Sequence, residues 1–359
     1  MAGKQGSPGH SASHPRRIES YGGSGCLPPC FNLDKDAEDP SRHNAESQHS
    51  YDLMKIGCII VTYNGEKWIE PCLRSIFEAK PPHPSVWVVD NASPDRTVQV
   101  VRQGYPQVRV ICNEGNCGFA RGVNCGIRAA LQAGMDCLVL LNQDMVIETG
   151  WLEELEKVAR EKPSGIWGAL ELTYDGQGMD PANRLNLFEQ VPEILDDLLF
   201  GRLKDAYKSR VVFGGCVAIH RSVIERIGYF DELFFMYCED IDFCQRATRA
   251  GIEIWFLPFF RVRHRCSLSS EGGYENPRIA RLNRRGWMII SLKDPLRPFW
   301  RALAAELRIQ ARGVLRNVLW LRWEGISNCL SDGSWLLAHA GRIFSARTRD
   351  KRSASKLPV

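Results

Sequence analysis

Three carboxylates stand within four residues at Glu239, Asp240 and Asp242, directly after the apolar residues 234–237. Isolated carboxylates are costly to bury, so acids beside such a run need partners or a chemical task. A carboxylate held next to a hydroxyl can take up its proton. In a helix that begins at residue 239, the same acids would instead cap the positive end of the dipole. The cluster therefore predicts either a general base or an acid-capped helix, and Asp242 with Arg246 is expected to form an ion pair across one helical turn.

A second acidic position, Asp144, follows the apolar residues 137–141 by way of Asn142 and Gln143. A carboxylate at the end of a buried strand can provide a hard oxygen ligand for Mg²⁺ or Mn²⁺. Asp90 ends an earlier apolar segment in the same way. Ligands of parallel α/β sheets bind beyond the carboxyl ends of the strands, so Asp90 and Asp144 are expected at one edge.

The order of the elements predicts an α/β fold with a mainly parallel sheet flanked by helices. Strands are expected at residues 56–61, 86–90, 108–112 and 137–141, and helices from the 62–65 turn to 77, after 95, at 118–133 and at 150–161. Residues 175–208 are acidic and irregular, and we expect a loop or short helices there. Sheet structure is expected to resume at 211–219 and to close with 252–256 and 259–264.

Composition divides the chain into four regions. Residues 1–53 are rich in Gly, Ser, Pro and His, which predicts a disordered extension, and the position of Met54 just before the first expected strand suggests that translation could start there. We expect the α/β domain at 54–285, an amphipathic helical region at 286–345 and a basic flexible tail at 346–359.

The sequence has no apolar run of membrane-spanning length and no apolar core of a signal peptide, so we predict a cytoplasmic protein. We interpret its thirteen cysteines as reduced thiols, not as a disulfide framework.

Positive charge is concentrated at the C-terminus. Residues 296–359 hold twelve Lys or Arg and four Asp or Glu, a balance of +8 in a chain of net charge +4. Within 299–323, one helical face is apolar and the roughly opposite face carries arginines, which favours peripheral binding to the inner face of an anionic membrane over nucleic acid. The apolar face consists of Leu303, Leu307, Val314, Val318 and Leu321. Packing of this face on the catalytic domain or on a second subunit, as a homo-oligomer, remains the alternative.

Several motifs in order resemble glycosyltransferase family 2, the metal-dependent sugar transferases of GT-A fold, and in particular the bacterial rhamnosyltransferase-like branch. The motifs are residues 61–64 (VTYN), 89–95 (VDNASPD), 116–124 (NCGFARGVN), 141–144 (LNQD), 213–215 (FGG), 239–242 (EDID), and His264 with Ser267. The resemblance covers roughly residues 55–285. It implies a Rossmann-like nucleotide-binding half and an acceptor half, followed by the C-terminal helical extension.

The resemblance also implies roles for individual residues. Asp240 is the expected catalytic base with Glu239 as its neighbour, Asp144 and His264 are expected to hold Mg²⁺ or Mn²⁺, and Gly214 and Gly215 lie on the acceptor side. The residues expected to bind the nucleotide-sugar are Thr62, Tyr63, Asn64, Asp90, Asn116, Gly118, Arg121, Asn124 and Asn142. Gln143 stands where the family pattern has proline.

The implied reaction is an inverting transfer of a sugar from a nucleotide-diphosphate donor to a hydroxyl of a saccharide or lipid-linked saccharide, in cell-surface polysaccharide biosynthesis. Two alternatives stay open. A nucleotidyltransferase would need a Gly-rich, basic phosphate loop after the first strand, which residues 61–66 do not provide. A degenerate transferase would bind the nucleotide-sugar without catalysis.

Overall fold

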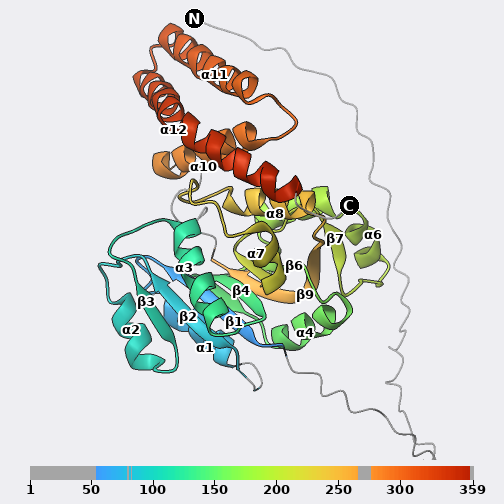
Figure 1. Cartoon of the computed structure of the whole chain (residues 1–359). Coiled ribbons are helices and arrows are strands. Elements are labelled where there is room, and N and C mark those ends of the chain that lie inside the picture. Colours follow the sequence, from blue (N-terminus) through green and yellow to red (C-terminus); the bar gives the residue numbers. More distant parts are fainter. Residues whose placement is uncertain (1–53, 79–80, 82, 266–275, 356–359) are drawn as a thin grey trace, which may run out of the picture. The chain divides into compact units, whose positions relative to one another are not determined.

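The computed structural model describes residues 54–78, 81, 83–265 and 276–355 (Figure 1). The predictions made for residues 1–53 and for Ser267 lie outside this part of the chain.

A mixed sheet of nine strands forms the centre of the described region, in the order β3-β2-β1-β4-β8-β6-β9-β5, with β7 paired to β9. The strands are β1 (Ile56–Thr62), β2 (Ser85–Asp90), β3 (Arg109–Cys112), β4 (Cys137–Asn142), β5 (Met145–Ile147), β6 (Ile166–Thr173), β7 (Tyr207–Ser209), β8 (Cys216–His220) and β9 (Ile254–His264).

Parallel pairing is continuous in the first half of the sheet. Strands β3, β2, β1 and β4 run parallel, and Thr62 is aligned with Asp90 while Val61 is aligned with Asn142. The carboxyl ends of these strands therefore meet at one edge, as the sequence predicts. The second half is mixed, because β8 runs antiparallel to both β4 and β6, and β9 runs parallel to β6 but antiparallel to β5 and β7.

Other sequence-based predictions change in the second half. The predicted strand 211–219 is shortened to Cys216–His220, and residues 211–215 form a loop that carries the paired glycines. The two predicted closing segments form the single strand β9, whose register with β6 shifts at Ala169 and Leu170. Residues 175–208 contain α5 (Pro181–Gln190), α6 (Glu193–Leu199) and β7.

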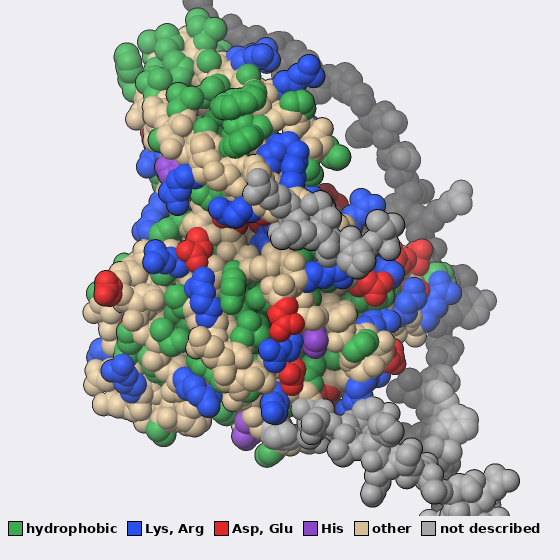
Figure 2. Space-filling view, in the orientation of Figure 1, with side chains coloured by type: hydrophobic (Ala, Val, Ile, Leu, Met, Phe, Trp, Pro, Cys, Tyr) green, Lys and Arg blue, Asp and Glu red, His purple; other side chains and the backbone are tan. Residues whose placement is uncertain are grey.

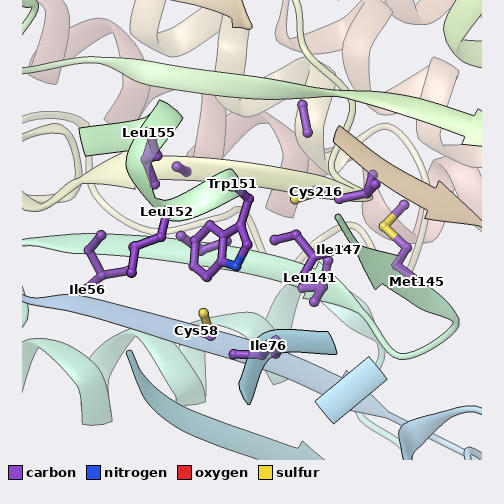
Figure 3. Close-up of a cluster of buried hydrophobic side chains, with 14 of the residues drawn as sticks. Ile56, Cys58, Ile76, Leu141, Met145, Ile147, Trp151, Leu152, Leu155 and Cys216 are labelled. Carbon is purple, nitrogen blue, oxygen red and sulfur yellow. The ribbon is translucent and has the colours of Figure 1, made fainter. Parts of the chain in front are cut away.

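Helices cover both faces of the sheet. Helices α1 (Ile69–Phe77), α2 (Thr97–Gly104) and α4 (Trp151–Glu161) bury apolar side chains in one core cluster, and α3 (Phe119–Gln132), α7 (Arg221–Ile227) and α8 (Glu239–Arg249) bury theirs in another. Alternate residues of β1 enter the two clusters: Cys58 and Ile60 enter the first and Ile59 the second. Figure 3 shows part of the first cluster, in which Trp151 of α4 lies among side chains from strands and helices.

Three helices follow the sheet: α10 (Pro277–Lys293), α11 (Phe299–Leu319) and α12 (Trp323–Ser355). They share a core cluster that also includes Phe234 and Cys238, so the helical extension packs on residues next to the acidic motif. The predicted boundary at residue 285 falls inside α10, and the predicted flexible tail is helical up to Ser355. The α/β class with a C-terminal helical extension is confirmed.

No helix within the described ranges is long and apolar enough to cross a membrane. The ten cysteines in that part of the chain are all free.

Candidate active site

The acidic motif is held at the start of α8 by the loop that carries Gly214. The Gly214 amide donates to Asp240 Oδ2 at 3.0 Å, and the Ile241 amide donates to Asp240 Oδ1 at 2.8 Å. The two residues that precede the helix, Tyr237 and Cys238, have φ values of 71° and 67°. Left-handed backbone at two consecutive non-glycine residues is costly and persists only where the surroundings impose it. The acidic motif is thus presented by a tightly constrained turn.

The two neighbouring acids differ in their surroundings. Glu239 is buried, and its Oε2 atom has no hydrogen-bond partner among the described residues. Burial, with a smaller contribution from the Asp240 charge, raises the pKa of Glu239 to about 8. Burial also raises the pKa of Asp240, but the Gly214 and Ile241 amides act in the opposite direction. Burial therefore favours the protonated form of Glu239, while the two amides favour the charged form of Asp240, which makes Asp240 the better placed carboxylate to accept a proton.

Gly215 connects this motif to a second group of polar side chains. A Cβ atom at Gly215 would come within 2.6 Å of Glu171 Oε1 and would also collide with Met145, so a larger residue would have to displace the ends of these two side chains. Glu171, from β6, contacts His264 Nδ1 through Oε2 at 3.2 Å. On the other side of the same imidazole, Nε2 lies 3.6 Å from Asp144 Oδ1. Strands β4, β6 and β9 therefore bring the two predicted metal ligands together.

The residues fit a divalent cation. The buried Nε2 of His264 lacks a hydrogen-bond partner in the described structure, and it faces the carboxylate of Asp144. Burial lowers the pKa of His264, but the carboxylates of Asp144 and Glu171 outweigh burial and raise it to about 11. A cation that takes Nε2 would thus have to displace a proton. No group of three His, Cys, Asp or Glu side chains within the described ranges could hold a metal alone, so substrate oxygens or water would complete the shell.

Glu171 was not predicted from the sequence, although a signal was present. It is the single acid in the apolar strand 166–172, where a buried carboxylate needs a partner. Arg265 was also overlooked. Its guanidinium lies over the Trp68 ring, 4.2 Å from the centroid, and its amide donates to the Asp144 carbonyl at 3.2 Å. An exposed cation is therefore placed next to the predicted metal site.

At the ends of β1 and β2, Thr62 and Asp90 contact each other. Both are buried, and the Thr62 hydroxyl donates to Asp90 Oδ1 at 2.9 Å. The Ser93 amide donates to Asp90 Oδ2 at 2.9 Å, so Asp90 caps the following turn. Binding of the nucleotide-sugar by Thr62 and Asp90 stays a prediction. Asn64, with φ of 53°, is exposed, and its amide donates to Ser93 Oγ at 3.1 Å.

Gln143, the departure from the family pattern, joins two loops. Its Oε1 atom accepts from the Tyr63 amide and its Nε2 atom donates to the Tyr63 carbonyl, both at 3.1 Å. The side chain of Tyr63 is 39% exposed, and Asn142 and Asp144 are half-buried. Gln143 therefore aligns Tyr63 with Asn142 and Asp144 at one edge of the sheet.

Two residues of the 116–124 motif contact the backbone of the 230–235 segment. Gly118 has φ of 85°, and a Cβ atom there would collide with the Phe235 carbonyl. Asn124 is buried and exchanges hydrogen bonds with the Phe230 backbone at 2.9 and 3.0 Å. Their binding of the nucleotide-sugar stays a prediction.

Two further residues of this motif were predicted to bind the nucleotide-sugar. Asn116 accepts from the Gly118 amide at 3.1 Å and is half-buried. Arg121 is exposed, and its Nε atom lies 4.0 Å from Glu232 Oε2.

Residues 58–228 match the family model described as glycosyl transferase family 2. This segment of the chain is therefore similar to a family 2 glycosyltransferase domain. The matched segment includes Asp144, while Asp240 and His264 follow it.

Curated relatives of this domain transfer sugars. The low-salt glycan biosynthesis hexosyltransferase Agl10 of Haloferax volcanii is 30% identical over 56% of this chain and 64% of its own length. The N-acetylglucosaminyl-diphospho-decaprenol L-rhamnosyltransferase of Mycobacterium tuberculosis is 29% identical over 74% of this chain and 92% of its own length. The chain thus spans less than two thirds of the archaeal relative. Among solved structures, S. aureus TarS gives a TM-score of 0.48 at 17% identity over 84% of this chain and 54% of that one.

The candidate active site is thus built from two groups of residues that the Gly214–Gly215 loop joins. Asp144, His264, Glu171 and Arg265 form one group, and Glu239 and Asp240 form the other.

Proposed function

We propose that this protein transfers a hexosyl residue, such as rhamnosyl, from a nucleotide-diphosphate sugar to a hydroxyl of a saccharide carried on a lipid diphosphate, with inversion at the anomeric carbon. The observation that carries the proposal is the placement of Asp240 and Asp144 on either side of the paired glycines. Gly214 binds Asp240, while Gly215 packs on Glu171, which reaches the His264–Asp144 pair. The printed name of the mycobacterial relative, with its decaprenol-linked acceptor, supports the acceptor class.

Each residue has a chemical task in this proposal. Asp240, oriented by the Gly214 and Ile241 amides, takes the proton of the attacking hydroxyl. Asp144 and His264 would hold Mg²⁺ or Mn²⁺, which when bound neutralises the departing diphosphate. Arg265 stands beside them as a second positive charge for the diphosphate. A single displacement by the acceptor hydroxyl inverts the anomeric configuration.

The test is a transfer assay with the full chain. Nucleoside-diphosphate hexoses, including a rhamnose donor, are supplied with Mn²⁺ or Mg²⁺ and a polyprenyl-diphosphate-linked N-acetylglucosamine. We expect a glycosylated lipid whose new linkage has the anomeric configuration opposite to that of the donor, as read by NMR. Retention of configuration would contradict the single displacement. Binding of donors with no transfer to any saccharide acceptor would favour the degenerate transferase instead.

A further inference from the structure

Exposed apolar side chains gather where α11 turns into α12. We define the hairpin tip as residues 315–324, and its large apolar members are Leu315, Val318, Leu319, Trp320, Leu321 and Trp323. Trp320, Leu321 and Trp323 are 70%, 74% and 75% exposed. Figure 2 shows hydrophobic side chains massed over the end of these helices with Lys and Arg beside them. A contiguous patch of this kind marks an interaction surface.

The turn at the hairpin tip has a defined structure. The Arg322 amide donates to the Asn317 carbonyl at 2.8 Å, and Leu321 has φ of 52°, a region that favours glycine or asparagine. Gly325 packs directly on the Asn317 side chain, because a Cβ atom at Gly325 would collide with it. A large apolar side chain therefore occupies the outermost position of a tight turn where a small polar residue would be less strained.

The charged residues around the hairpin tip indicate which kind of partner it binds. Arg312, Arg316 and Arg322 are exposed in or beside the hairpin tip, against one exposed acid, Glu324. Tryptophan and arginine together are typical of the membrane–water interface, where indole rings sit at headgroup depth and arginine binds anionic lipid. We infer that the hairpin tip inserts into the headgroup region of a membrane that contains anionic lipid. The inference rests on the proposed function only in that a lipid-linked acceptor would lie in the same membrane.

This surface differs from the face predicted from the sequence. Leu303 is buried and Leu307 is half-buried in the core that α11 shares with α10 and α12, so the first half of the predicted face packs on the protein. The last part of that face, Val318 and Leu321, remains exposed at the hairpin tip. A second copy of the chain is the less suitable partner, because a two-fold interface would place the same patch, with Arg316 and Arg322 in it, against itself and bring like charges together.

The experiment is co-sedimentation of the full chain with vesicles of phosphatidylcholine alone or mixed with phosphatidylglycerol, at low and high salt. Leu321→Ser with Trp323→Ser should lower the vesicle partition coefficient at least about tenfold, since two large apolar side chains no longer insert. Arg316→Gln with Arg322→Gln should remove the preference for anionic vesicles and reduce the salt dependence. The matched control is Leu199→Ser with Phe200→Ser, an equally exposed apolar pair at the end of α6, which should bind like the wild type.

Two results would overturn the inference. One is wild-type protein that does not bind anionic vesicles at low salt, or hairpin-tip variants that bind as well as the wild type. The other is a dimer in lipid-free sedimentation velocity that the same variants abolish, which would make the tip an interface between copies. Circular dichroism checks that each variant is folded. The hairpin-tip variants should transfer sugar to an acceptor with a short, water-soluble lipid at the wild-type rate. This assay tests the proposed catalysis without a membrane, so failure of the catalytic proposal can be told apart from failure of the membrane inference.

Discussion

Lys293 Nζ lies 2.7 Å from Asp242 Oδ1, and both side chains are almost completely buried. The same ammonium group contacts Asp231 at 2.6 Å and Asp350 at 3.1 Å, while Arg246 Nε lies 2.9 Å from Asp242 Oδ2. Helices α8, α10 and α12 therefore meet at one buried cation. Asp242, two residues from the proposed base, anchors α8 and takes no part in the chemistry.

Replacing Lys293 with Met should strongly destabilise the fold, because three carboxylates would lose their shared cation. Breaking a buried ion pair on one side typically costs about 3–5 kcal/mol of unfolding free energy. Urea unfolding followed by circular dichroism measures the change. The matched control is Lys208→Met, whose exposed pair with Glu253 should contribute about 0–1 kcal/mol. Equal losses of unfolding free energy in the two variants would show that the buried network stabilises the fold no more than the exposed pair does.

Asp240→Asn should reduce kcat by about 10²–10⁴, because the amide cannot take up the acceptor proton. Affinity for the donor should change little, since the Asp144–His264 pair is untouched. The measurements are steady-state kinetics of transfer and calorimetric titration of the nucleoside diphosphate with Mn²⁺. Glu239→Gln is the companion variant and should retain far more activity. If Glu239→Gln lowered kcat more than Asp240→Asn, Glu239 would be the base.

Asp144→Ala should weaken Mn²⁺-dependent binding of the nucleoside diphosphate, because a hard oxygen ligand is lost. Glu171→Gln should give a milder version of the same defect, since it removes the charge that holds the His264 imidazole. Binding measured with Mn²⁺ and with excess EDTA separates the metal-dependent part. Full transfer activity of the wild type in EDTA would rule out the metal role.

The raised pKa of Glu239 predicts a pH-dependent stability. An acid whose pKa is about 8 in the folded state and near 4.5 when unfolded binds its proton more tightly in the folded state. Its contribution is present below pH 4.5 and is lost as the pH rises towards 8. Glu239→Gln removes this loss, so the Tm difference between variant and wild type should shift in favour of the variant from pH 5 to pH 9. A Tm difference that stays the same from pH 5 to pH 9 would mean that Glu239 is ionised in the folded protein at neutral pH.

The sequence predicted those features that depend on local pattern. Alternating strands and helices gave the first half of the sheet, and the i,i+4 spacing correctly paired Asp242 with Arg246. It could not reveal that Lys293 completes that pair, because the two residues are far apart in the chain and nothing local couples them.

Polar residues posed a related difficulty. Thr62 and Asn124 carry the same functional groups whether they bind a ligand or saturate their hydrogen bonds inside the fold, and the structure shows the second. A glycine such as Gly118 indicates that another group lies close to the backbone, but the sequence does not identify that group. In the structure the group is the Phe235 carbonyl. A buried acid in a strand was a usable signal for Glu171, since such a carboxylate must have a partner.

The loop at residues 230–238 has a mechanical consequence. Its Phe230 backbone is held by Asn124, and its Phe235 carbonyl accepts from the Phe119 amide at 2.6 Å, so the loop is bound to α3. The same loop runs directly into α8, which carries Asp240. Moving this loop away from α3 would break these three hydrogen bonds together. We therefore expect substrates to enter and products to leave while the loop stays bound to α3.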